Sequence, residues 1–106
     1  MLSYYSTREE IEKSGVDTVV LPIGSVEQHG SHLPIGTDFL IGNKVGEAVC
    51  KRIGALLLPT LPVSTCREHS GSRGNVWMNS DTLYQVLRDI TESLKSQGFH
   101  RVILII

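Results

Sequence analysis

Residues 16–38 of the chain read VDTVVLPIGSVEQHGSHLPIGTD. The first eight residues form an apolar run of strand length that is rich in valine and isoleucine, which predicts a buried strand. The remainder is a loop that carries one glutamate, two histidines and one aspartate among glycines and a proline. A helical pattern opens at Asp38. Because loops at the ends of buried strands place side chains accurately, this stretch predicts a functional site in an α/β protein.

Helical and strand patterns alternate along the rest of the chain. We expect helices over Ser6–Gly15, Asp38–Ile53 and from Asn79 or Ser80 to Gly98, and strands over Val16–Ile23, Ala55–Pro59 and Arg101–Ile106. Ser6 and Glu9 fit a capping box at the start of the first helix. Gly42 and Gly46 either let the second helix pack closely on a sheet or are simply weak helix formers. Apolar strands without polar alternation predict a three-layer α/β/α fold with a mostly parallel sheet.

The spacing of the polar residues in the loop favours a metal site. Glu27 and His29 are two residues apart, so in an extended segment they project to the same side. Asp38 returns from the other end of the loop with two carboxylate oxygens that could bridge two cations. This oxygen and nitrogen set, without a thiolate, suits Zn²⁺, Mn²⁺ or a similar divalent ion. Alternatively, the histidines bond to the backbone and Glu27 is solvated; we expect His32 to support the ligands or the loop.

A second loop, Ser64–Asn79, is unusually long for a compact domain, which predicts a functional role. His69, Arg73 and Trp77 are its candidates for contact with a substrate, although Trp77 could equally be a packed core or interface residue.

Composition restricts the class of protein. The chain has 106 residues, of which 41% are hydrophobic and 20% charged, with a formal net charge of -1. This is typical of one small globular domain, and there is no basic excess for nucleic acid. The apolar runs are too short for a bilayer, and the N-terminus lacks a signal-peptide pattern. Cys50 and Cys66 lack metal-site spacing, which predicts reduced thiols in a cytoplasmic protein. The partner that we expect is a small-molecule substrate.

The loop also resembles the signature of the creatininase (creatinine amidohydrolase) family. The resemblance runs through Ser25–Asp38, Glu68-His69, Arg73-Gly74-Asn75, Asp81-Thr82-Leu83 and Gly98–Ile106. It implies a homo-oligomeric dinuclear metal hydrolase that cleaves C–N bonds of cyclic or formylated amides. The implied ions are zinc or manganese, with iron as a further candidate. By this resemblance Asp38 bridges both ions, and Glu27 and His29 hold one each.

The chain departs from the family pattern in two places. The family continues after the last strand into an Asn-Gly-His loop, and its histidine with a later glutamate completes the metal site. We therefore expect residues 1–106 to be the N-terminal part of a single creatininase-like domain, truncated after the strand ending at Ile106, unless another chain supplies the remainder. In the second loop Arg73 and Asn75 stand where proline and threonine are expected, which favours a more polar or anionic ligand than creatinine.

The predicted function is metal-assisted hydrolysis. A hydroxide formed on two divalent ions would attack the carbonyl of an amide, and an acid that we do not identify in this chain would protonate the leaving nitrogen. One alternative keeps the metals but opens a cyclic ketone or lactone of a carbohydrate. The other is a non-catalytic assembly module that binds partner chains through its last strand and long loop.

Overall fold

The computed structural model describes residues 1–66 and 71–106. Its elements in chain order are α1 (Arg8–Ser14), β1 (Thr18–Pro22), α2 (Thr37–Ile53), β2 (Leu56–Leu57), α3 (Ser80–Ser96) and β3 (Arg101–Ile105). This order of helices and strands is the one that the sequence predicts. The strands β1 and β2 are each three residues shorter than predicted. Beyond β2, Leu58 still donates its N–H to the carbonyl of Val20, but the next donor to β1 is Leu61, so the regular register of the ladder ends.

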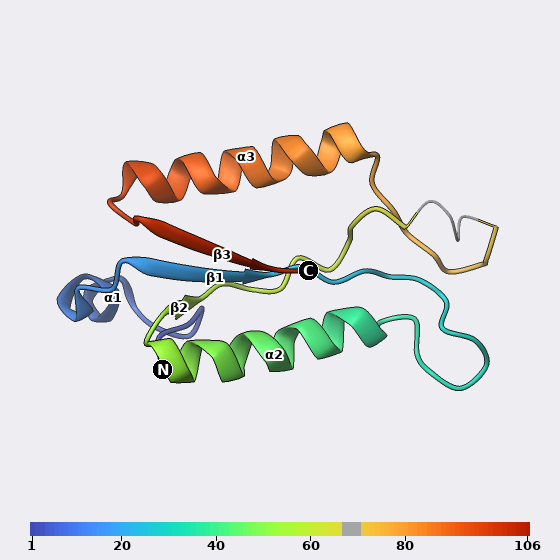
Figure 1. Ribbon diagram of the computed structural model, residues 1–106, viewed down its shortest axis with the longest axis horizontal. Helices are drawn as coiled ribbons and strands as arrows, with labels where there is room; N and C mark the ends of the chain where they lie inside the picture. Colours follow the sequence, from blue (N-terminus) through green and yellow to red (C-terminus); the bar gives the residue numbers. More distant parts are fainter. Residues whose placement is uncertain (67–70) are drawn as a thin grey trace.

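The three strands form one parallel sheet in the order β2-β1-β3. The central strand β1 pairs with β3 along its whole length, from Thr18 opposite Arg101 to Pro22 opposite Ile105. Its other edge pairs with the two residues of β2. Helix α2 covers one face of this sheet and α3 lies along the other (Figure 1). The predicted three-layer α/β/α architecture is therefore confirmed.

The core lies on both faces of β1. Val19 is fully buried on one face, where it packs with Leu56 of β2 and Leu94 of α3. Val20 is fully buried on the opposite face, where it packs with Cys50 of α2 and Leu57. Successive side chains of a strand point to opposite faces, so a strand covered on both sides must be apolar at every position. This explains the apolar run from Val19 to Ile23 in the sequence.

Helix α2 packs closely against the end of β1 through its glycines. Gly42 and Gly46 are both buried. A Cβ atom added at Gly46 would lie 2.6 Å from Cγ of Pro22 and 3.0 Å from Cδ1 of Leu57, which is closer than carbon atoms normally approach. The prediction of close helix–sheet packing is confirmed, and this contact fixes α2 beside the strand end from which the metal-site loop leaves.

The predicted capping box of the first helix is wrong by one residue. Thr7 is the N-cap: its hydroxyl accepts from the backbone N–H of Glu10, and the Glu10 carboxylate accepts from the backbone N–H of Thr7. Ser6 is occupied elsewhere, because its hydroxyl oxygen accepts from the backbone N–H of Ser3. Two adjacent hydroxyl residues made both registers possible, and this second contact decides between them.

Strand β3 is less buried than its sequence predicts. Its side chains are exposed or half-buried, since the strand lies at an edge of the sheet and is paired on one side. Ile103 and Leu104 are each more than one-third exposed. Among the described residues, no helix is long and apolar enough to cross a membrane.

Candidate metal centre

Backbone hydrogen bonds fix the first loop at the point where it leaves the sheet. The N–H of Ile23 donates to the carbonyl of Ile105 at 2.7 Å, and the N–H of Gly24 donates to the carbonyl of Leu61 at 2.8 Å. Further on, the N–H of Glu27 donates to the carbonyl of Ile35 at 3.0 Å, so the outgoing and returning limbs of the loop lie side by side. This geometry brings the start of the loop next to the first turn of α2.

Three of the predicted site residues meet at that point. Glu27, His29 and Asp38 each offer one ligand atom, and these atoms all lie within 4.8 Å of one another. The three side chains are half-buried. Nε2 of His29 lies 3.2 Å from Oδ2 of Asp38, so the imidazole faces the carboxylate. Two carboxylates and one imidazole, converging from one loop and one helix start, are a donor set that fits a divalent cation.

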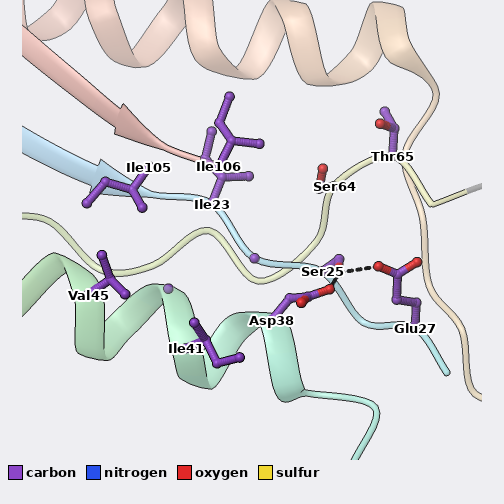
Figure 2. A pocket seen from close by; sticks show the side chains of 12 residues that line it. Ile23, Ser25, Glu27, Asp38, Ile41, Val45, Ser64, Thr65, Ile105 and Ile106 are labelled. Atoms are coloured by element: carbon purple, nitrogen blue, oxygen red, sulfur yellow. Dashed lines mark hydrogen bonds between the residues drawn. The ribbon is translucent and has the colours of Figure 1, made fainter. Parts of the chain in front are cut away.

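Ser25 joins this cluster, and the sequence analysis did not identify it. Its hydroxyl lies 2.6 Å from Oδ2 of Asp38 and 3.0 Å from Oε1 of Glu27 (Figure 2). A signal was available in the sequence, because Ser25 is the first polar side chain after the buried strand and lies two residues before Glu27. In an extended segment that spacing places both side chains on the same side.

The surroundings of Asp38 keep it ionised. The hydrogen bond from Ser25 is the largest influence and lowers the pKa of the Asp38 carboxyl below its ordinary value. Partial burial opposes this by raising the pKa, while the neighbouring Glu27 and His29 side chains lower it further. Asp38 also lies in the first turn of α2, where the helix dipole favours negative charge. The group is thus an anion at neutral pH, as a cation ligand must be.

A cavity of about 510 Å³ adjoins the cluster. One part of its wall is polar, with Glu27 and Asp38 beside Ser25, Ser64 and Thr65 (Figure 2). The other part is apolar and is formed by Ile23, Ile41, Val45, Ile105 and Ile106. A small molecule bound here would therefore have its polar end at Glu27 and Asp38.

The structure does not bring the other predicted site residues to this cavity. His32 is exposed near the tip of the first loop, Arg73 is exposed in the second, and Trp77 is 37% exposed. None of these three is among the described residues that line the cavity. Their roles stay predictions, and His69 lies outside the described residues.

The second loop is bonded to the first. The N–H of Gln28 donates to Oδ1 of Asn75 at 2.8 Å, and the N–H of Val76 donates to the carbonyl of Val26 at 3.0 Å. The Cys66 thiol lies between the carbonyls of Val26 and Val76. Asn75, which stands where the family pattern has threonine, thus holds the backbone between the candidate ligands Glu27 and His29. Cys66, like Cys50, is a buried thiol.

Comparison with known proteins identifies the family. The model of the creatininase family, described as creatinine amidohydrolase, matches residues 4–106. The chain belongs to the creatininase family. Creatinine amidohydrolase of Pseudomonas putida is 31% identical over 96 residues, which are 86% of this chain and 37% of that protein. A mycofactocin precursor peptide peptidase of Mycobacterium ulcerans is 33% identical over 85 residues, 72% of this chain and 34% of that protein.

Solved creatininase structures share the fold. A crystal structure of creatinine amidohydrolase superposes with a TM-score of 0.88 at 29% identity, covering 97% of this chain and 43% of that one. A manganese form gives a TM-score of 0.87 at 28% identity, with 97% and 44% covered. A variant described as a Zn–Zn type gives 0.85 at 29% identity, with 96% and 43% covered. The chain thus spans less than half of the length of its creatininase relatives.

A more distant relative is named for a different activity. The 3-dehydro-scyllo-inosose hydrolase of Thermotoga maritima is 26% identical over 90 residues, which are 84% of this chain and 29% of that protein.

Proposed function

We propose that this chain contributes the metal-binding loop of a metal-dependent hydrolase that cleaves a C–N bond of a cyclic or formylated amide. The observation that carries the proposal is the convergence of Glu27, His29 and Asp38 within 4.8 Å at the end of the central strand. Membership of the creatininase family supports it, because the relatives named creatinine amidohydrolase and precursor peptide peptidase both act on amide-type substrates by their names.

The proposed cofactors are two divalent ions, with manganese and zinc as the first candidates because solved creatininases exist in those forms. When bound, such ions supply a nucleophile at neutral pH and polarise the scissile carbonyl. Asp38 would hold both ions. Glu27 and His29 would each complete the coordination of one ion, with further ligands supplied from outside these three residues.

The residues around the cluster would bind and orient the substrate. The amide would lie against the polar wall of the cavity, near Ser64 and Thr65, and its non-polar part would contact Ile41 and Val45. Those side chains would also exclude bulk water from one side of the reacting bond, which strengthens electrostatic interactions there. A cytoplasmic location and a homo-oligomeric state are parts of the same proposal.

Metal content is the direct test. The purified chain is reconstituted with Zn²⁺ or Mn²⁺, desalted and measured by elemental analysis, beside a Glu27→Gln, Asp38→Asn double variant. We expect metal in stoichiometric amounts in the wild type and loss of it in the double variant. A Glu9→Gln, Asp89→Asn variant removes the same charges from exposed helical positions and should retain the metal. Equal metal content in all three proteins, or metal in none, would contradict the proposal and favour a non-catalytic assembly module.

The second candidate function keeps the metals and changes the bond. The observation that favours it is the similarity to the Thermotoga maritima hydrolase, whose named substrate is a cyclic keto-sugar derivative. A panel of creatinine, formylated amides, short peptides and cyclic ketones or lactones of carbohydrates, tested on the metal-loaded protein, separates the two. Ring opening of a ketone or lactone without amide cleavage would select the second candidate.

A further inference from the structure

The Ser25 hydroxyl lies between two of the proposed metal ligands. It is 2.6 Å from Oδ2 of Asp38 and 3.0 Å from Oε1 of Glu27 (Figure 2). A serine hydroxyl has one proton to donate, and both carboxylates compete to accept it. Two carboxylates this close would otherwise repel each other. The hydroxyl is therefore a polar bridge that keeps both groups directed toward the same point.

The backbone holds Ser25 at this position. Ser25 is 7% exposed, and the preceding Gly24 donates its N–H to the carbonyl of Leu61. A Cβ atom at Gly24 would lie 2.5 Å from Cα of Phe39, so the strand end touches the main chain of the first turn of α2. Because Phe39 directly follows Asp38, this close approach sets the distance between Ser25 and Asp38. The hydroxyl is fixed by the fold and does not depend on a mobile side chain.

We propose that Ser25 is a positioning residue of the metal centre, which orients the carboxylates of Asp38 and Glu27 for binding the ions. The inference rests on the proposed function, since it assigns a role to a residue that touches the ligands and not the ions. Hydrogen bonds to ligating carboxylates fix their orientation, and loss of such a partner typically weakens metal binding by about 10–100-fold.

A merely structural role makes a different prediction. If the hydroxyl only satisfied a buried polar position, its removal would lower the stability of the fold and leave the affinity of the folded protein for metal unchanged. Metal affinity measured on folded protein therefore separates positioning from structural support.

The test compares three variants with the wild type. Ser25→Ala removes the hydroxyl, Ser25→Thr keeps one, and Ser3→Ala makes the same serine-to-alanine change at a buried, hydrogen-bonded serine that does not line the cavity. Each metal-free protein is first checked for folding by circular dichroism and is then titrated with Mn²⁺ by calorimetry. The electron paramagnetic resonance spectrum of the bound Mn²⁺ reports its coordination.

For Ser25→Ala we expect a Kd for Mn²⁺ raised by about 10–100-fold and an altered spectrum. Ser3→Ala should bind Mn²⁺ as the wild type does, and Ser25→Thr should bind it more tightly than Ser25→Ala. A folded Ser25→Ala with wild-type affinity and spectrum would overturn the inference while leaving the proposed function intact. Failure of Ser25→Ala to fold would also overturn it, because the hydroxyl would then support the fold. A wild type that binds no Mn²⁺ or Zn²⁺ would refute the proposed function itself.

Discussion

Replacing Gly46 by alanine tests the contact that fixes α2 against the sheet. The added Cβ would lie 2.6 Å from Cγ of Pro22 and 3.0 Å from Cδ1 of Leu57, whereas carbon atoms in contact are about 3.5–4.0 Å apart. The leucine methyl group can rotate away, but the proline ring is closed onto the backbone of β1 and cannot. The helix must therefore shift, and the packing between α2 and the sheet must loosen.

The magnitude follows from two opposing contributions. Overpacking of this kind costs about 1–3 kcal/mol. Alanine in a helix interior is favoured over glycine by about 1 kcal/mol. We therefore expect Gly46→Ala to lower the free energy of unfolding by as much as about 2 kcal/mol.

Gly42 supplies the matched control one helical turn earlier. A Cβ atom there would meet its nearest neighbours at 3.7 Å, which is ordinary van der Waals contact. Gly42→Ala should therefore gain the helix contribution without the clash and raise the free energy of unfolding by up to about 1 kcal/mol. The helix contribution cancels in the difference between the two variants, which leaves the overpacking cost of about 1–3 kcal/mol.

The assay is urea unfolding of both variants in metal-free buffer, followed by far-ultraviolet circular dichroism. Thermal unfolding should show the same order, with about 4–8 °C between the Tm values for each kcal/mol of difference. If Gly46→Ala were as stable as Gly42→Ala, the close packing of α2 on Pro22 would be refuted as a constraint on this fold.

Two further predictions concern α1 and Cys50. Hydrogen bonds from the backbone N–H and the hydroxyl of Thr7 lower the pKa of the Glu10 carboxyl. The capping interaction therefore stabilises the fold fully above the ordinary glutamate pKa, and this stabilisation is lost as the pH falls through the lowered pKa. The difference in free energy of unfolding between wild type and Glu10→Gln should therefore be present at pH 7 and shrink as the pH falls below the ordinary glutamate pKa; a difference independent of pH would contradict the capping box. Burial raises the pKa of the Cys50 thiol, so iodoacetamide at pH 8 should leave Cys50 unmodified in the folded protein and alkylate it in urea, as followed by mass spectrometry; equal rates in both states would contradict its burial.

The sequence predicted the parts of this fold that depend on local patterns. Apolar runs identified β1 and β3. Gly15 and Gly54, which have a left-handed backbone conformation, end α1 and α2 at the positions that the sequence pattern predicted. The proximity of Glu27, His29 and Asp38 was predictable from the sequence. Glu27 and His29 lie on one extended segment, and Asp38 lies at the start of a helix that must pack on the same sheet. Their binding of metal stays a proposal.

The parts that the sequence did not predict depend on contacts that were not read from its local patterns. The spacing of Ser25 and Glu27 places both side chains on one side, but the contact of Ser25 with Asp38 comes from the close approach of Gly24 to Phe39. The N-cap of α1 is Thr7 because Ser6 is bonded to Ser3, and the exposure of β3 follows from its place at the sheet edge. Side chains on the second loop, such as Arg73 and Trp77, have no periodic pattern that fixes their direction, so their substrate contacts stay predictions.

The pairing of β1 with a strand from the far end of the chain has a consequence for biosynthesis. All the residues of the ligand cluster lie between the end of β1 and the first turn of α2, and this unit closes onto β2 at Leu57. Strand β3 leaves the ribosome after these elements, yet it holds the strand end through the hydrogen bond from Ile23 to Ile105. We expect the nascent chain to form the β1–α2–β2 unit first. In pulse-labelled amide exchange during refolding, the amide of Val20 should then be protected before that of Ile103. Simultaneous protection of both amides would show instead that β1 becomes ordered only when β3 pairs with it.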